Sequence, residues 1–180
     1  DARYYIDKSF QRNLVWSKNK MSRYIQSLVD GRASSSMITA DIRSAYVACQ
    51  LLSEKLGEDF LKHLDSKGYT SVSLDGMQRR KCILDFYYSR VSLDVVITDR
   101  HGNRHPCRGK YFKDLHTDAQ TAFLYSVCHM TTHMDTPYSE FSGIFVDIND
   151  GDGLNNQEKR NPIRTPISQE IRTLAESTYQ

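Results

Sequence analysis

The chain has 180 residues, a length that fits one domain with a buried core. Its formal net charge is only +2 at pH 7, so any contact with a nucleic acid must come from a local patch of basic side chains. The four cysteines are scattered without a Cys-x-x-Cys pair, and no apolar run approaches the ~20 residues that cross a membrane. These features exclude a disulfide-stapled secreted domain and a membrane protein, and they predict a cytoplasmic protein with free thiols. The first residue is Asp1, which fits a piece of a longer protein.

The amino-terminal part predicts a short strand and a helix. Residues 4–7 are apolar and aromatic enough for a strand. Ser17 can cap a helix that Gly31 ends, because the apolar positions between them follow the spacing of one helical face. These positions are Met21, Tyr24, Ile25 and Leu28.

The middle of the chain predicts a helical stretch, a strand and a further helix. Leucine or phenylalanine recurs every four residues within residues 44–64, which indicates one or two helices broken near Gly57. Residues 70–74 alternate as a strand does. A helix follows, in which Ile83, Leu84, Tyr87 and Tyr88 fall on one face.

The next segments predict a β-hairpin, a short helix, a strand and a longer helix. The hairpin has arms at residues 93–98 and 104–112 around a polar turn. Thr117 or Asp118 can cap the short helix, and residues 125–134 form the candidate strand. Thr136 and Pro137 predict the start of the longer helix, whose buried face is Phe141, Ile144, Phe145 and Ile148.

The carboxyl-terminal part contains turn signals and a candidate linker. The loop at residues 149–153 is rich in Asn, Asp and Gly, and two prolines make residues 161–167 the best linker candidate. A last helix is expected from Ser168. Helices and strands mix without a regular βαβ rhythm, which predicts an α+β fold.

The segment Asp75-Gly76-Met77-Gln78-Arg79 joins a predicted strand to a predicted helix. Amides at the start of a helix bind anions, Gly76 allows close approach of the backbone, and Arg79 can hold phosphate oxygens through two bonds. Asp75 can orient an arginine, hold a metal or act as a base. The alternative is a strand-to-helix turn with solvated charges.

Two other segments are candidates for anion or metal contacts. Gln11 and Arg12 precede the only tryptophan, Trp16, and offer a second anion contact or a stacking platform; otherwise Trp16 only anchors a helix in the core. The loop at residues 147–158 is similar to an EF-hand loop, but Asp152 stands where that turn needs glycine. A glycine-rich ligand loop or a helix stop is therefore preferred to calcium.

The predicted hairpin carries a basic ribbon that can follow a nucleic-acid backbone, or form a solvated edge that blocks aggregation. The histidines, among them His101, His105, His116, His129 and His133, show no convincing zinc spacing and are interpreted as structural. The candidate DNA-binding residues are Arg100, Arg104, Arg108 and Lys110.

Three fragments occur in an order that resembles the amino-terminal domain of GmrSD-type restriction endonucleases, a member of the ParB/sulfiredoxin-like superfamily. They are Phe-Gln-Arg with Val-Trp-Ser, then Leu-Asp-Gly-Met-Gln-Arg, then Phe-Val-Asp-Ile-Asn-Asp-Gly-Asp-Gly-Leu-Asn-Asn-Gln-Glu-Lys-Arg-Asn. Tyr-Phe-Lys-Asp-Leu at residues 111–115 adds to the resemblance, which spans residues 3–163. It implies a ParB/sulfiredoxin-like domain at residues 1–163 and a helical segment at residues 164–180 that begins another domain.

The resemblance implies nucleotide binding and hydrolysis in phage defence, with a separate HNH-type nuclease as partner. Mg²⁺ is expected as cofactor because a bound polyphosphate and Asp75 both favour it. It assigns catalysis to Asp75, Gln78 and Arg79, with Asp75 as the metal ligand. The phosphate-binding residues that it implies are Gln11, Arg12, Gly76, Asn149, Gly151 and Gly153, and Arg80, which the family does not share, is a further candidate for phosphate binding.

This sequence departs from the family motif, and two other functions stay open. Met77 stands where the family usually has glutamine, Arg80 where it has Leu or Val, and Cys82 where threonine is common. Hydrolysis is thus less secure than binding. The first alternative is a direct metal-dependent DNA nuclease or nickase that uses the same residues, and the second is a non-enzymatic interaction module.

Overall fold

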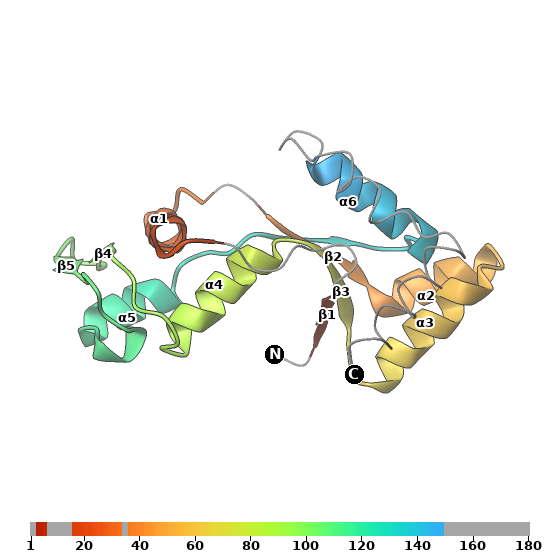
Figure 1. Cartoon of the computed structure of the whole chain (residues 1–180), viewed down its shortest axis with the longest axis horizontal. Coiled ribbons are helices and arrows are strands. Elements are labelled where there is room, and N and C mark those ends of the chain that lie inside the picture. Colours follow the sequence, from red (N-terminus) through yellow and green to blue (C-terminus); the bar gives the residue numbers. More distant parts are fainter. Residues whose placement is uncertain (1–2, 7–15, 34–35, 150–180) are drawn as a thin grey trace, which may run out of the picture. The chain divides into compact units, whose positions relative to one another are not determined.

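The computed structural model describes residues 3–6, 16–33 and 36–149, and residue 149 is described by its backbone alone. The described chain mixes helices with short strands, as the sequence predicts for an α+β fold (Figure 1). In this part of the chain, no helix combines the length and the apolar character needed to cross a membrane. The elements in chain order are β1 (Tyr4–Ile6), α1 (Lys18–Val29), β2 (Met37–Asp41), α2 (Ile42–Leu51), α3 (Lys55–Ser66), β3 (Ser71–Asp75), α4 (Met77–Tyr87), β4 (Val96–Thr98), β5 (Arg104–Pro106), the 3-10 turn η1 (Phe112–Asp114), α5 (Thr117–Leu124), β6 (Met130–His133), the 3-10 turn η2 (Tyr138–Glu140) and α6 (Phe141–Asn149).

The strands form two sheets. The larger sheet has the order β1-β3-β2-β6. Its β1 and β3 are parallel, with Tyr4 opposite Ser71 and Ile6 opposite Ser73. The smaller sheet is the antiparallel hairpin of β4 and β5, extended by a bridge between Leu93 and Lys110. The predicted β1, β3 and hairpin are thereby confirmed.

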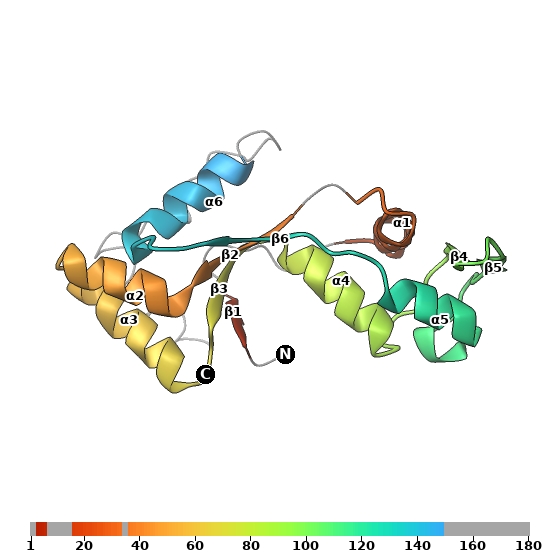
Figure 2. The ribbon, with the colours of Figure 1, turned by 180° about the vertical axis from the view of Figure 1, so that it is seen from behind.

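The chain divides into two compact units, each made of several segments. The first unit comprises residues 1–12, 40–75 and 133–180. In it α2 and α3 lie side by side, as Figures 1 and 2 both show, and α6 packs against β3. Rings from separate elements meet in its interior: the centroids of Phe60 and Tyr138 are 4.7 Å apart, and those of Tyr138 and Phe141 are 5.5 Å apart.

The second unit comprises residues 13–39 and 76–132 and contains α1, α4, α5 and the β4–β5 hairpin. Its core is apolar, and Phe86 of α4 lies at the centre, with its ring edge-on to Phe112 and Phe123 at 6.0 and 5.3 Å. The buried core residues of this unit are Met21, Ile25, Leu28, Cys82, Phe86, Leu93, Val95, Ile97, Cys107, Phe112, Leu115, Ala119 and Phe123.

Local capping signals placed α1 correctly. The Ser17 side chain accepts a hydrogen bond from the Lys20 amide, and Gly31 has a positive φ of 69° just beyond the helix. Met21, Ile25 and Leu28 are buried as predicted. The sequence signals for helix start, helix end and buried face therefore agree in this segment.

The predicted break near Gly57 is wrong. The chain turns at Leu52–Glu54, where Ser53 has a φ of 58°, and Gly57 lies inside α3. A Cβ at Gly57 would lie 2.7 Å from Cys49 Sγ and 2.9 Å from Tyr138 Cβ, so this glycine permits close helix packing and does not end a helix. Leu52 and Leu56, two members of the four-residue pattern, are 64% and 57% exposed.

The face of α4 that the sequence spacing indicates is not the most buried face of this helix. Cys82 and Phe86 are fully buried, whereas Tyr87 and Tyr88 are 41% and 55% exposed. The phenylalanine cluster of the core selects Phe86, and the phenolic hydroxyls favour water. Helix periodicity alone did not decide between these neighbouring faces.

Three predicted boundaries differ from the structure. His116, not Thr117 or Asp118, caps α5 by accepting a hydrogen bond from the Asp118 amide. The strand predicted at residues 125–134 is only Met130–His133, because the Tyr125 amide still bonds to Thr121 of α5. Pro137 precedes the 3-10 turn η2 and is not the first residue of α6. Phe141 and Phe145 are buried as predicted. The predicted domain boundary at residue 163, the linker and the last helix lie outside the described residues.

Candidate functional site at the start of α4

The predicted junction between a strand and a helix is present at Asp75 and Gly76. Asp75 ends β3, and Gly76 caps α4 with a φ of 86° and without a side-chain hydrogen bond to the helix. A Cβ at Gly76 would lie 2.7 Å from Met37 Cγ and 3.0 Å from Met37 Cα. Both the positive φ and the closeness of Met37 therefore require glycine.

The first turn of α4 presents backbone donors and an unpaired carboxamide oxygen. The amide of Arg80 bonds to the Gly76 carbonyl over 2.9 Å, whereas helix geometry leaves the amides of Met77, Gln78 and Arg79 without an acceptor inside the helix. The Gln78 Oε1 atom is buried and accepts no hydrogen bond from any described atom. A buried acceptor without a donor costs about 1–3 kcal/mol. Among the described atoms, the buried Gln78 Oε1 therefore has no donor.

Arg79 lies among polar groups of the second unit. Its guanidinium donates to the main-chain oxygen of Ser36 over 2.7 Å. Partial burial raises the pKa of the Cys128 thiol, while a hydrogen bond with Tyr24 and the charge of Arg79 lower it. Burial, followed by the neighbouring Cys128, raises the pKa of Tyr24, and Arg79 again opposes the shift. The guanidinium of Arg79 is therefore close enough to the Cys128 thiol and the Tyr24 hydroxyl to lower the pKa of both groups.

Other predicted parts of the phosphate site lie outside the described structure. Gln11, Arg12, Gly151 and Gly153 are outside the described residues, and Asn149 is described only as the last backbone position of α6. Asp75, Gly76, Gln78, Arg79 and Arg80 follow one another around the β3–α4 junction, as predicted. Of the phosphate site that the sequence predicts, the structure therefore describes only the segment at residues 75–80 with its side chains.

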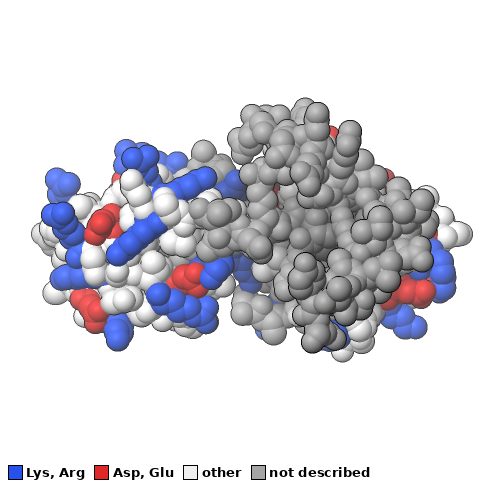
Figure 3. Space-filling view, viewed as in Figure 1, with Lys and Arg blue, Asp and Glu red and all other residues white. Residues whose placement is uncertain are grey.

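The predicted DNA-binding residues lie on and beside the β4–β5 hairpin, and all four are exposed. Arg100 is in the turn, Arg104 is in β5, and Arg108 and Lys110 follow it. In Figure 3, Lys and Arg side chains are scattered among uncharged and some acidic ones over the described surface in the left half of the view, where the hairpin lies. All four predicted DNA-binding side chains are therefore accessible to solvent.

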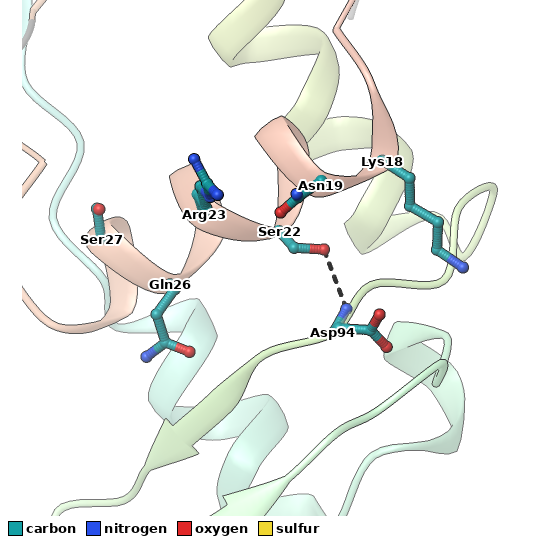
Figure 4. Close-up of a pocket in the computed structure, with 7 residues that line it drawn as sticks. All are labelled: Lys18, Asn19, Ser22, Arg23, Gln26, Ser27 and Asp94. Atoms are coloured by element: carbon teal, nitrogen blue, oxygen red, sulfur yellow. Dashed lines mark hydrogen bonds between the residues drawn. The ribbon is translucent and has the colours of Figure 1, made fainter.

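A pocket of about 530 Å³ lies along the polar face of α1. Figure 4 shows that its floor includes the hydrogen bond from the Asp94 amide to Ser22 Oγ, which is 3.0 Å long. Gln26 both donates to and accepts from the Val96 backbone, at 2.8 and 2.7 Å. Ser22 and Gln26 thus already have hydrogen-bond partners in the backbone of Asp94 and Val96, and the pocket lies where α1 packs against the chain at the start of β4. Its lining is Lys18, Asn19, Ser22, Arg23, Gln26, Ser27 and Asp94.

The structure brings together a group of side chains that sequence reasoning did not combine. The possible ligand atoms of His105, His116 and Asp118 lie within 4.8 Å of one another. The sequence interpretation considered His105 with His101 and Cys107 and interpreted His116 as structural. Cys107 is in fact buried, and its thiol donates to the His105 carbonyl over 3.1 Å. The sequence signal that could have indicated part of this cluster is the pair His116 and Asp118, two residues apart at the start of a helix.

Comparisons with known proteins identify no relative. No family model matches the chain, and neither a curated protein nor a solved structure matches it.

Proposed function

We propose that this chain binds a nucleoside triphosphate with Mg²⁺ at the amino end of α4. We further propose that this binding regulates or takes part in DNA cleavage or nicking in a defence or phage-related system. The observation that carries the proposal is the buried Gln78 Oε1 without a described donor, at the second residue of a helix that glycine caps. The four cysteines are free thiols, in keeping with a cytoplasmic setting.

A nucleotide offers acceptors to helix amides and a donor to Gln78 Oε1. Phosphate oxygens accept hydrogen bonds from helix amides, and their negative charge is favoured by the helix dipole. A ribose hydroxyl, a base amino group or a water bound to Mg²⁺ can donate to Gln78 Oε1. A simple inorganic anion would satisfy the amides but would leave the carboxamide oxygen unpaired.

The side chains around the junction have distinct proposed roles. Arg79 and Arg80 neutralise the phosphates, and Asp75 holds the Mg²⁺ ion or its water. Gln78 orients the γ-phosphate or an attacking water. Resemblance alone adds a second set of contacts to the phosphates, which consists of Gln11, Arg12, Asn149, Gly151 and Gly153.

The DNA part of the proposal rests on the exposed hairpin. Arg100, Arg104, Arg108 and Lys110 offer contacts to phosphates that do not depend on base sequence. The membership in the ParB/sulfiredoxin-like superfamily and the partnership with an HNH-type nuclease are likewise proposals, and they rest on the order of motifs in the sequence.

The test measures nucleotide affinity in matched variants. Calorimetric titration with ATP and GTP in Mg²⁺ is carried out on the unmodified chain, Gln78→Met, Arg79→Gln and Arg43→Gln. Arg43 has the same charge but a side chain that is 82% exposed, and it belongs to the other unit. Loss of a buried hydrogen bond predicts about a tenfold weaker Kd for Gln78→Met, and Arg43→Gln should bind normally. Equal affinity in all four proteins, or no binding at all, would overturn the nucleotide proposal.

The same proteins are then incubated with supercoiled plasmid, with and without nucleotide, while phosphate release and strand nicking are followed. Nicking that requires nucleotide supports regulation. Metal-dependent nicking without nucleotide, abolished by Asp75→Asn, would instead establish the direct nuclease. Nucleotide binding with neither phosphate release nor nicking, alone or with added HNH-type nuclease, would contradict the role in cleavage.

A further inference from the structure

A cluster of two imidazoles and one carboxylate lies beside the β4–β5 hairpin. His105 is in the middle of β5, His116 caps α5, and Asp118 is in the first turn of that helix. Figures 1 and 2 both show the hairpin next to α5. The possible ligand atoms of the three side chains all lie within 4.8 Å of one another. The fold therefore converges nitrogen and oxygen donors from two elements of the second unit.

A buried carboxylate fixes His105 from behind. The Asp99 side chain is 2% exposed, and its Oδ2 lies 3.0 Å from His105 Nε2. Asp99 also accepts from the His101 and Asn103 amides, at 2.8 and 2.9 Å, so the carboxylate is rigidly held. An Nε2–H donated to Asp99 leaves the lone pair on His105 Nδ1. Histidines that bind metals characteristically have such a carboxylate or carbonyl on the other nitrogen.

The second histidine, His116, lies beside the third candidate ligand, Asp118. His116 Nδ1 accepts the hydrogen bond from the Asp118 amide over 3.3 Å, so this nitrogen carries a lone pair. The same Nδ1 lies 3.4 Å from Asp118 Oδ2. A cation bound by both atoms would take the Nδ1 lone pair from its long hydrogen bond with the Asp118 amide. The His116 ring is also parallel to that of His105, with centroids 5.1 Å apart and 12° between the planes.

We propose that His105, His116 and Asp118 form a site for a divalent first-row transition metal of the Zn²⁺ type. Imidazole nitrogen favours Zn²⁺, Fe²⁺, Co²⁺ and Ni²⁺ over Mg²⁺, which takes oxygen ligands. Metal bonds of about 2.0–2.2 Å require the ligands to close in slightly. The side chains of His116 and Asp118 are 64% and 55% exposed and have the freedom to do so. Three protein ligands leave a coordination position for water.

The site is independent of the proposed nucleotide site, and its test uses the metals alone. The full chain, freed of metal with a chelator, is titrated with Zn²⁺ by calorimetry and with Co²⁺ by visible absorption. The variants are His116→Asn and Asp118→Asn, with His101→Ala as the matched control. Asparagine at position 116 keeps an oxygen that caps α5 while it removes the imidazole. His101 is an exposed histidine of the same hairpin that does not belong to the cluster.

We expect one Zn²⁺ per chain and a Co²⁺ spectrum without the near-ultraviolet band of a thiolate ligand. Loss of one of three ligands should weaken Zn²⁺ binding at least tenfold in His116→Asn and Asp118→Asn, and His101→Ala should bind as the unmodified chain does. The proposal would be overturned if the unmodified chain did not bind Zn²⁺ or if the Co²⁺ spectrum showed a thiolate band. It would also be overturned if His116→Asn and Asp118→Asn bound Zn²⁺ as tightly as the unmodified chain does. Circular dichroism confirms that each variant is folded before titration.

Discussion

Arg79 is tied to Ser36 by a hydrogen bond of 2.7 Å from its guanidinium to the main-chain oxygen, which joins the first turn of α4 to the residue before β2. The same guanidinium lowers the pKa of Cys128. The reactivity of the Cys128 thiol therefore offers a test of the position of Arg79 that does not need a ligand.

The reactivity of Cys128 should depend on Arg79 and on pH. Since partial burial raises the pKa of this thiol, its alkylation by iodoacetamide should increase with pH beyond pH 9, about tenfold per unit below the pKa. Arg79→Gln removes a charge that lowers the pKa, so alkylation at pH 8 should become severalfold slower. Mass spectrometry of the labelled peptides measures the rates. Arg90→Gln, in which an exposed arginine paired with Asp85 is removed, is the control and should leave the rate unchanged. An unchanged or faster rate in Arg79→Gln would contradict this prediction.

Gln78 should cost the ligand-free protein stability. Replacement by methionine removes the buried oxygen without a described donor, so the free energy of unfolding in urea should stay the same or increase by about 1 kcal/mol. Gln26→Met is the matched comparison, because Gln26 satisfies the Val96 amide and carbonyl. That variant should lose about 2 kcal/mol. Equal losses in the two variants would show that Gln78 is satisfied in solution.

Gly76 should be more sensitive to alanine than another glycine of similar conformation. Gly76 and Gly102 have φ values of 86° and 84°, but only a Cβ at Gly76 meets Met37. The strain of positive φ predicts a loss of about 1 kcal/mol for Gly102→Ala. Overpacking against Met37 should bring Gly76→Ala to about 3 kcal/mol. Urea unfolding tests the difference, and similar losses would mean that the chain near Met37 moves aside.

The two helical glycines should respond to alanine in opposite directions. A Cβ at Gly57 would lie 2.7 Å from both Cys49 Sγ and Glu54 Oε1, whereas one at Gly143 has nothing within 4 Å. Gly143→Ala should stabilise the protein by up to about 1 kcal/mol through helix propensity. Gly57→Ala should destabilise it by about 1–3 kcal/mol in spite of the same propensity gain. Thermal unfolding gives both signs, and stabilisation by Gly57→Ala would refute the close packing of α2 and α3.

Features that depend on residues close together in the sequence could be predicted without the structure. The Ser17 cap, Gly31, the hairpin around Asp99 and the Asp75–Gly76 junction were all predictable, since capping and turn chemistry act over a few residues. The sequence also placed Gln78 and Arg79 at the start of a helix. It could not show that the Gln78 oxygen is buried or that Arg79 reaches Ser36, because these properties depend on segments that are distant along the chain.

The buried faces of the helices and the contacts between distant side chains depend on how the elements pack against each other, so they could be read from the structure alone. Phe86 is buried in place of Tyr87 because Phe112 and Phe123 pack against it. Spacing along the sequence likewise did not reveal that His105 and His116, on a strand and at a helix start, stack in parallel. Helical and strand periodicities specify directions within one element, whereas the packing of elements against each other determines which of those directions lead to the core and which bring donors together.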